Sequence, residues 1–360
     1  MRLGQTSLVY FVSRFGWSVI GALATLYIAR ELGSAPLGIF QLTTGLVAWV
    51  AIVGQAGVSG ALTKRVSEGR EVGAYTAAGG VAVGSLFAIA ALLVSLFAGS
   101  VNTYIGYPAA AYIIAILFLV LTFSLIGSLL SGLHRVHIRG ILTMLKTVGQ
   151  SASQIAAVFA GFGVVGLYLG HMIGYVLVIL VGTYFVRDGL SRVKSPEKKH
   201  FSSLTDFAKF SWVGSLQSRM FNYTDILVLG FFVSQSLIGI YAVAWNVGQF
   251  LILFSGTLKS TLFPEMSSMS AEQDPQAVSR IVEQSLMFGG LFLIPGLFGG
   301  VLLGERILRL YGPAFPQGAT ILSILIVANL FMGYQNQLLN TLNAIDRPDL
   351  AFRVNVVFVA

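Results

Sequence analysis

The sequence predicts an all-α, polytopic membrane protein built from two parallel six-helix bundles. Of its 360 residues, 56% are hydrophobic and only 10% are charged, and the mean hydropathy is +0.82. A soluble domain carries about a quarter charged residues, so much of this chain is expected to face lipid. The hydrophobic residues fall in runs of roughly 20, the length that an α-helix needs to cross a bilayer.

Ten such runs, and the start of an eleventh, are predicted to span the membrane. The predicted spans are 8–29, 37–60, 75–98, 109–132, 141–162, 165–186, 208–233, 237–262, 285–304 and 317–342. The eleventh begins near Leu350 and reaches only Ala360. A helix that stopped in mid-bilayer would leave its last carbonyl groups unsatisfied, so we expect a truncated sequence and an incomplete second bundle.

The basic residues are distributed unevenly between the two predicted sides. With the N-terminus inside, fifteen Lys and Arg residues fall in inner segments, and three, Arg30, Arg306 and Arg309, fall in outer loops. Basic residues favour the cytoplasmic side of a membrane protein. The bias predicts a multi-pass protein of the cell membrane with a cytoplasmic N-terminus. It also explains the net charge of +8 without a nucleic-acid partner.

The longest polar segment follows the sixth predicted span and contains the loop signal Ser195-Pro196-Glu197-Lys198-Lys199. It divides the chain into an N-terminal six-helix bundle (1–186), a cytoplasmic linker (187–207) and an incomplete C-terminal bundle (208–360). Because six is an even number, both bundles enter the membrane from the same side. Parallel repeats of this kind are related by an axis along the membrane normal.

An internal repeat supports this division. The first copy reads Ser13-Arg14-Phe15, an apolar run, and then Leu37-Gly38-Ile39-Phe40. About 205 residues later the second copy reads Ser218-Arg219-Met220, an apolar run, and then Ile238-Gly239-Ile240-Tyr241. Each copy places an arginine inside an apolar helix, where a charge is costly and is usually kept for a function. Two arginines in corresponding places predict a site shared by the two halves.

Polar side chains at three-to-four spacing line one face of several predicted helices, which indicates a hydrated central cavity. The candidate substrate-binding residues on these faces are Arg14, Arg219, Lys146, Gln150, Asn222, Gln249 and Asn336. For a single Asn or Gln, the alternative is a hydrogen bond to a neighbouring helix. For Lys146 and Arg14, the alternative is a side chain that reaches back to the interface.

Asp225 is the acidic residue that lies clearly inside a predicted span. It is either a protonatable carboxylate that couples transport to an ion, or one partner of a structural ion pair. His171, in the sixth span, is expected to be a packed and hydrogen-bonded imidazole rather than a proton relay.

The sequence also excludes several kinds of chemistry. It has no cysteine, so disulfides, thiolate catalysis and cysteine-bound metals are excluded. It has no G-x-x-x-x-G-K-[ST] phosphate loop, no H-E-x-x-H motif and no nucleophile elbow. A membrane glycosyltransferase would be expected to carry acidic metal or base residues at an interface, or a sizeable outer domain, and the sequence shows neither. We therefore expect a secondary transporter without a cofactor or metal, rather than an enzyme.

Six stretches of the chain resemble the polysaccharide-biosynthesis flippases of the multidrug/oligosaccharidyl-lipid/polysaccharide exporter superfamily. The order and spacing of the stretches carry the resemblance, which covers essentially the whole chain. The stretches are Leu32-Gly33-Ser34-Ala35-Pro36-Leu37-Gly38-Ile39-Phe40, residues 222–230, residues 238–244, Leu262-Phe263-Pro264-Glu265-Met266, Ile307-Leu308-Arg309-Leu310-Tyr311-Gly312, and Leu339-Asn340-Thr341-Leu342-Asn343 with Asp346-Arg347-Pro348.

This resemblance implies twelve to fourteen helices and the movement of oligosaccharides linked to a polyprenyl phosphate or pyrophosphate. Such flippases carry their cargo from the inner to the outer leaflet by alternating access. Arg14 and Arg219 match the cavity arginines that are thought to bind the phosphate and sugar headgroup. The implied partners are the lipid-linked oligosaccharide, membrane lipids, and glycan polymerases or glycosyltransferases.

Two other functions stay open at this point. A drug/cation antiporter of the same superfamily would need acidic cavity residues, and Asp225 is the one that qualifies in the sequence. A non-transporting membrane scaffold of a glycan-assembly complex would not need the two arginines for export.

Overall fold

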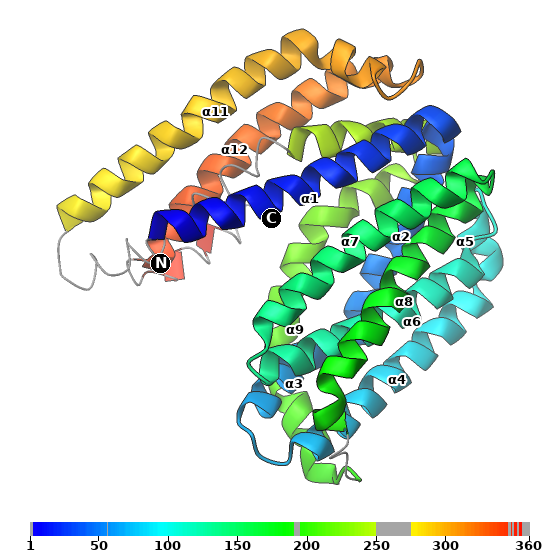
Figure 1. Ribbon diagram of the computed structural model, residues 1–360, viewed down its shortest axis with the longest axis vertical. Helices are drawn as coiled ribbons and strands as arrows, with labels where there is room; N and C mark the ends of the chain where they lie inside the picture. Colours follow the sequence, from blue (N-terminus) through cyan, green and yellow to red (C-terminus); the bar gives the residue numbers. More distant parts are fainter. Residues whose placement is uncertain are drawn as a thin grey trace. The chain divides into compact units, whose positions relative to one another are not determined.

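The computed structural model describes residues 3–55, 57–190, 195–249 and 275–344, together with 347, 349–350 and 353–354. Throughout these residues the regular structure is helical, and the described segments contain no strand (Figure 1). This confirms the predicted all-α class.

From α1 to α8 the helices follow one another with short connections. In chain order they are α1 (Leu3–Leu32), α2 (Ser34–Gln55), α3 (Val58–Ser67), α4 (Val72–Leu96), α5 (Ala98–Ile105), α6 (Ala110–Gly132), α7 (Val136–Phe159), α8 (Gly163–Leu190), α9 (Lys198–Leu229), a helix at 235–249, α11 (Pro275–Arg309), a 3₁₀ turn (Phe315–Gly318) and α12 (Ala319–Ala344). Among the described residues, five helical stretches are long and apolar enough to cross a membrane: Ser34–Ile52, Val72–Leu96, Ala110–Gly132, Gly163–Arg187 and Phe315–Gln335.

The chain forms two compact units. One consists of residues 23–242, and the other of residues 1–22 together with 243–360. The predicted halves, 1–186 and 208–360, do not coincide with these units. Most of α9 belongs to the second predicted half, but it packs against α2 and α3 in the unit 23–242. The halves stay a prediction about sequence duplication.

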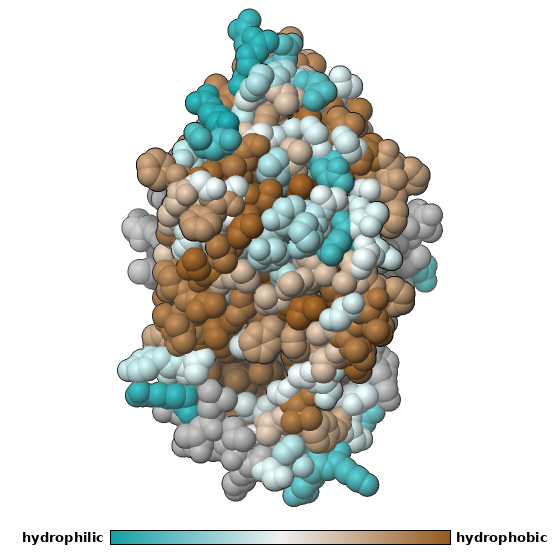
Figure 2. All heavy atoms as spheres, turned by 90° about the vertical axis from the view of Figure 1, so that its right-hand side faces the viewer, coloured by the Kyte–Doolittle hydropathy of each residue, from teal (hydrophilic) through white to brown (hydrophobic). Residues whose placement is uncertain are grey.

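Lipid-facing surface is abundant on the long helices. Figure 2 shows one face on which hydrophobic residues form broad areas, with hydrophilic residues at both ends and across the upper middle. Large apolar side chains are exposed along α4 and α8, which is expected where the surrounding medium is hydrocarbon rather than water. These side chains are Val81, Ile89, Leu92, Leu93, Leu96, Ile173, Val176, Leu177, Leu180 and Tyr184.

One predicted span, 37–60, is wrong as a single helix. The structure ends α2 at Gln55 and begins α3 at Val58, with Gly57 between them in the left-handed region at φ +76°. A Cβ atom on Gly57 would overlap the backbone of Ala208 on α9. Glycine is therefore required here, because the turn needs a positive φ and α9 approaches too closely for a side chain.

The predicted linker is also largely helical, because α8 continues to Leu190 and α9 starts at Lys198. The start of α9 is stabilised by a capping box. The backbone N–H of Glu197 donates to Nδ1 of His200 over 2.9 Å, and the Glu197 side chain accepts from the backbone N–H of His200. Residues 198–207 are thus the first turns of α9 rather than a loop.

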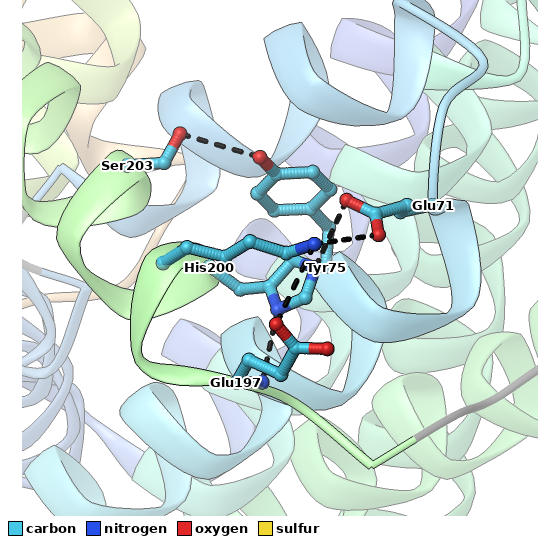
Figure 3. Close-up of polar contacts among 6 residues, drawn as sticks. Glu71, Tyr75, Glu197, His200 and Ser203 are labelled. Atoms are coloured by element: carbon cyan, nitrogen blue, oxygen red, sulfur yellow. Dashed lines mark hydrogen bonds and ion pairs between the residues drawn. The ribbon is translucent and has the colours of Figure 1, made fainter.

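A polar cluster attaches this end of α9 to the corner between α3 and α4 (Figure 3). Glu71 lies at that corner with φ +50°, and its carboxylate accepts from Lys199 Nζ at 2.9 Å. His200, which is almost fully buried, places Nε2 3.3 Å from the other Glu71 oxygen. The His200 ring also meets the Tyr75 ring edge-on at 4.8 Å between centroids. The hydrogen bond from Lys199 is the main cause that lowers the pKa of Glu71 below its ordinary value of 4.5.

Helices α7 and α8 pack closely because glycines recur every four residues on α8. A Cβ atom on Gly166, Gly170 or Gly174 would approach α7 to 3.2 Å or less. Its nearest neighbours there would be Ala157, Gln154 and Gln150, respectively. Small residues at this spacing are the usual means by which membrane helices bring their backbones together.

The two copies of the internal repeat meet each other inside the unit 23–242. Gly38 on α2 packs on the backbone of Gln235, and Gly239 packs on the backbone of Ser34, so that a Cβ atom on either glycine would overlap a carbonyl oxygen. The hydroxyl groups of Ser34 and Ser236 are hydrogen-bonded over 2.6 Å. Ser34 and Gln235 begin their helices, so each repeat glycine contacts the first residue of the other helix. Such reciprocity is the signature of a local two-fold relation.

In the unit formed by 1–22 and 243–360, α11 packs against α12. Gly300 contacts Ile326 and Gly304 contacts Leu322, and both partner side chains are buried. In the connection between α11 and α12, the ring centroids of Tyr311 and Phe315 lie 6.1 Å apart. The apolar contacts of this pair extend over the end of α11 and the start of α12.

The reciprocal glycine contact predicts the effect of adding one methyl group. Gly239→Ala should destabilise the purified protein by about 1–3 kcal/mol, because the backbone of Ser34 must move. The control is Gly80→Ala on α4, where a Cβ atom meets nothing within 4 Å and stability should hold or rise. Thermal unfolding measures both variants. Equal melting temperatures for Gly239→Ala and wild type would contradict the close contact.

The Glu71–Lys199 pair predicts a pH dependence of stability. Because folding lowers the pKa of Glu71, its ionised carboxylate stabilises the folded protein above pH 4.5, the ordinary pKa of the group. This stabilisation is lost as the pH falls through the lowered pKa of the folded state. Glu71→Gln should therefore be less stable than wild type at pH 7, and the difference should shrink below pH 4.5. Lys199→Gln should also be less stable at pH 7, whereas Lys198→Gln serves as a charge control. Parallel unfolding curves for Glu71→Gln and wild type at all pH values would refute this contribution.

Candidate functional site

The predicted site residues are divided between the two compact units. Arg14, Gln249 and Asn336 belong to the unit formed by 1–22 and 243–360. The unit 23–242 contains the others, which are Lys146, Gln150, Arg219, Asn222 and Asp225. The backbones of α1, α9 and α12 are described at Arg14, Arg219, Asn222 and Asn336, but their side chains lie outside the described residues. Their roles stay predictions.

Asp225 on α9 contacts the repeat motif of the second half. The hydroxyl of Tyr241, from the helix at 235–249, donates to Oδ2 of Asp225. The other carboxylate oxygen, Oδ1, is buried without a hydrogen-bond partner among the residues that the structure describes, and so is the hydroxyl of Thr224. A buried acceptor without a donor costs about 1–3 kcal/mol, and more when it is charged. The structure thus supports one polar contact of this carboxylate, which is the hydrogen bond from Tyr241.

The corresponding positions in the first half are apolar. At the offsets of the repeat, Asp225 corresponds to Ile20 and Tyr241 corresponds to Phe40. Phe40 packs against the rings of Tyr168, at 5.9 Å, and His171, at 5.5 Å. The polar pair of the second half is thus replaced by an apolar pair in the first half.

The sequence left open that the Lys146 side chain reaches back to the membrane interface at the start of its helix. In the structure its ammonium lies elsewhere. α7 begins at Val136, and the Lys146 ammonium lies over the Tyr175 ring, 4.9 Å from its centroid. Tyr175 is 12 residues from both Gly163 and Arg187, near the middle of α8. The Tyr175 ring also meets the His171 ring at 5.2 Å and the Phe123 ring at 5.8 Å. The ammonium is therefore held at mid-helix depth by an aromatic face.

The polar residues that follow Lys146 on α7 face α8. Gln150 lies against Gly174, where a Cβ atom would come within 2.8 Å, and its side chain is half-buried. Gln154, one turn further, is buried and donates to the carbonyl oxygen of Leu167 over 3.0 Å. For Gln154 the structure thus supports hydrogen bonding between helices, which was the alternative to substrate binding.

In the other unit, Gln249 is half-buried and follows Gly248, which packs against Asn329 of α12. The Asn329 amide nitrogen is buried and unpartnered within the described part of the chain. Polar groups in this position favour a hydrated or ligand-bound surface. The helix that carries Asn336, α12, thus also carries a buried amide without a hydrogen-bond partner among the described residues.

Sequence reasoning missed Tyr241 and Tyr175 as functional candidates. An aromatic residue in an apolar helix is indistinguishable from a packing residue until its hydroxyl or ring partner is known. The signal for Tyr241 was present in the repeat, because its counterpart Phe40 lacks the hydroxyl just as Ile20 lacks the carboxylate of Asp225.

The chain is similar to curated proteins over nearly its whole length. The Haloferax volcanii protein named "Probable flippase AglR" is 30% identical over 363 residues, covering 99% of this chain and 75% of the relative. The "Probable low-salt glycan biosynthesis flippase Agl15" of the same organism is 28% identical, covering all of this chain and 76% of the relative. Both relatives are named as flippases rather than as enzymes.

Solved structures agree on the fold. The lipid II flippase MurJ in an inward closed conformation superposes with a TM-score of 0.75 at 16% identity, covering 96% of this chain and 78% of that one. A multidrug resistance MATE family transporter of the MOP superfamily, in an inward-facing conformation, gives a TM-score of 0.69 at 14% identity, covering 94% of this chain and 83% of that one.

At such identities the likeness shows the fold alone, that of a multi-pass helical membrane protein. The family model described as "Polysaccharide biosynthesis protein" matches residues 27–315. With this match and the likeness to AglR, the chain belongs to the polysaccharide biosynthesis protein family.

Proposed function

We propose that this protein is a flippase that moves polyprenyl-phosphate- or pyrophosphate-linked oligosaccharides from the inner to the outer leaflet. The observation that carries the proposal is the 30% identity to a named flippase over 99% of the chain. The two corresponding arginines of the repeat support an anionic cargo, since a basic residue inside an apolar helix is costly without a ligand or partner. The cell membrane, with the N-terminus cytoplasmic, is the proposed location.

In this mechanism the two halves alternate between inward and outward access around a central site. Arg14 and Arg219 attract the lipid phosphate, with Lys146 as a third basic group. Gln150, Asn222, Gln249 and Asn336 donate and accept hydrogen bonds to sugar hydroxyls. The apolar polyprenyl chain stays in the bilayer between helices, so only the polar headgroup crosses through the protein. Glycan polymerases or glycosyltransferases would act before and after this step.

The reciprocal contact between Gly38 and Gly239 supports a movement by rigid halves. Backbones that meet without intervening side chains are close-packed and do not deform continuously. Such a contact either holds or separates, which suits a two-state gate between corresponding helices of the two halves.

Coupling to an ion is assigned to Asp225. Its Oδ1 atom is buried and has no partner in the described segments, while Tyr241 holds Oδ2. A proton or a small cation at Oδ1 would complete the carboxylate and would leave when the site opens to the other side. The first half has Ile20 and Phe40 in these places, so the coupling site belongs to the second half.

A drug/cation antiporter of the same superfamily is the second candidate. It would need carboxylates to bind a cationic cargo, and the helices α2, α6 and α7 contain no Asp or Glu. A scaffold without transport activity is the third candidate. The arginine variants below separate it from a flippase.

Replacing the two repeat arginines tests the flippase function. In an export-deficient strain, the double variant Arg14→Ala/Arg219→Ala should lower surface glycan about tenfold or more, since each charged hydrogen bond is worth roughly 1.5–3 kcal/mol. Arg306→Ala, in the last turn of α11, removes an arginine at a helix end and should complement like wild type. Quantitative glycan labelling and membrane insertion are measured together. Normal export by a well-inserted double variant would favour the scaffold.

Removing the carboxylate tests ion coupling. In proteoliposomes carrying a fluorescent polyprenyl-phosphate glycan, an imposed proton or sodium gradient should speed flipping by wild type. Asp225→Asn should flip at the same rate with and without the gradient, since the amide cannot take up a proton or balance a cation. Tyr241→Phe, which leaves the carboxylate present, should keep a gradient response. A gradient response in Asp225→Asn equal to that of wild type would remove Asp225 from the coupling site.

A further inference from the structure

His200, at the start of α9, uses both of its ring nitrogens in hydrogen bonds (Figure 3). Nδ1 lies 2.9 Å from the backbone nitrogen of Glu197, and Nε2 lies 3.3 Å from a carboxylate oxygen of Glu71. A backbone N–H can only donate, so Nδ1 accepts and carries no proton. The proton of the neutral ring is therefore on Nε2, which donates it to Glu71.

The bond to Nδ1 exists only while the imidazole is neutral. A protonated histidine has an N–H at both ring nitrogens and accepts at neither. Proton uptake by His200 would place an Nδ1–H group against the backbone N–H of Glu197, so that two donors would face each other. The capping box at the start of α9 would then lose one of its two bonds.

The burial of His200 links this loss to an opening of the helix. The residue is 1% exposed, and the Tyr75 ring covers it edge-on at 4.8 Å between centroids. A donor that is left unpaired away from water is unfavourable. The first turn of α9 must therefore open to let water reach the Nδ1–H group, so proton uptake and opening become one step.

The charged groups that face the imidazole belong to both helices at this corner. Glu71, at the start of α4, accepts from Lys199 over 2.9 Å, and the Lys199 ammonium lies 3.5 Å from the Glu197 carboxylate. Tyr75 of α4 faces the ring as well, and its hydroxyl donates to Ser203 over 3.4 Å. The nearest charges are thus two carboxylates and one ammonium. A proton on the imidazole is opposed by the donor at Nδ1 rather than by an excess of positive charge.

Helix α3 ends at the same corner, and its ions have partners of their own. Arg65 binds Glu68 over 3.0 Å, and the Lys64 ammonium lies 4.7 Å from the centroid of the Phe207 ring. These side chains keep their charges in the range from about pH 5 to about pH 8, where histidine changes its charge.

Glu71 also stays ionised in this range. The hydrogen bond from Lys199 is the main cause that lowers the pKa of Glu71 below its ordinary value of 4.5. The carboxylate therefore accepts from Nε2 before and after His200 takes up a proton. The bond that changes is the one at Nδ1, which closes the first turn of α9.

We propose that His200 is a pH-sensitive cap of α9, which closes the first turn of the helix when it is neutral and opens that turn when Nδ1 takes up a proton. The cap lies where the connection from the first half of the chain enters α9. The same helix carries Arg219, Asn222 and Asp225 further along. With the proposed orientation, the cap lies on the cytoplasmic side and responds to cytoplasmic pH.

The capping box itself offers a matched variant. A glutamine in this position can also accept from the backbone N–H of the N-cap residue, but its amide does not titrate. His200→Gln should therefore keep the turn closed at every pH, and His200→Ala, which has no acceptor, should leave it open at every pH. His137→Gln, at an exposed position near the start of α7, controls for the loss of a histidine.

Hydrogen exchange of the full chain in nanodiscs, followed by mass spectrometry and corrected for the intrinsic effect of pH, measures the opening between about pH 8 and about pH 5. In wild type and His137→Gln, acid should speed exchange of the first amides of α9 about fivefold, the effect of one lost helix cap. In His200→Gln their protection should not depend on pH. The absence of acid-induced opening in wild type, or equal opening in His200→Gln, would overturn the proposal.

The protonation state of the ring is a second readout. Nitrogen-15 NMR of the labelled histidines identifies His200 by the signal that His200→Gln lacks. At neutral pH this ring should carry its proton on Nε2, and it should become an imidazolium over the same pH range as the turn opens. A proton on Nδ1 at neutral pH, or a ring that stays neutral while the turn opens, would contradict the mechanism.

Neither measurement needs a transported lipid, so the result is separate from the proposed function. A protein that flips no lipid could still show the acid-induced opening of α9. A cap that does not respond to pH would leave the export test of Arg14 and Arg219 unaffected.

Discussion

The contact between Gly38 and Gly239 constrains the arrangement of the helices around it. Two helices, one from each copy of the repeat, meet backbone to backbone, and each glycine packs on the first residue of the other helix. No other residue type fits either position, because a Cβ atom would overlap a carbonyl oxygen. The contact fixes the helix at 235–249 against α2, and the same helix presents Tyr241 to Asp225 on α9. The position of the candidate coupling site thus follows from two glycines.

Symmetry in the backbone coexists with asymmetry in the side chains. The two copies share the arginine and the glycine, so both halves inherit the same packing and the same basic charge. They differ at the pair Asp225 and Tyr241, which corresponds to Ile20 and Phe40. Both members of the pair differ between the copies, and in the second copy the Tyr241 hydroxyl donates to the Asp225 carboxylate. Under the proposed function, the basic residues are common to both copies and the carboxylate belongs to the second copy alone.

Helix α9 is held at several points along its length within the unit 23–242. At its start, Glu71 binds Lys199 and His200; further on, Ala208 packs on Gly57; at its end, the Tyr104 hydroxyl donates to the carbonyl oxygen of Leu227 over 2.6 Å. Each of these contacts joins residues that are more than 100 positions apart in the sequence. A helix that carries candidate binding and coupling residues is thereby packed against the first half of the chain.

The sequence by itself determined the all-α membrane class, most of the helix positions, the repeat and the candidate basic residues. These follow from local properties: apolar run length, loop charge and the cost of a charge in lipid. Only the tertiary structure decided the break at Gly57, the early start of α9, the partner of Asp225 and the depth of the Lys146 ammonium. Each of these depends on a neighbour far away in sequence, such as Ala208 for Gly57 or Tyr175 for Lys146. The sequence shows which residues carry a charge or lack a side chain. Only the folded structure shows which distant residue packs against each of them.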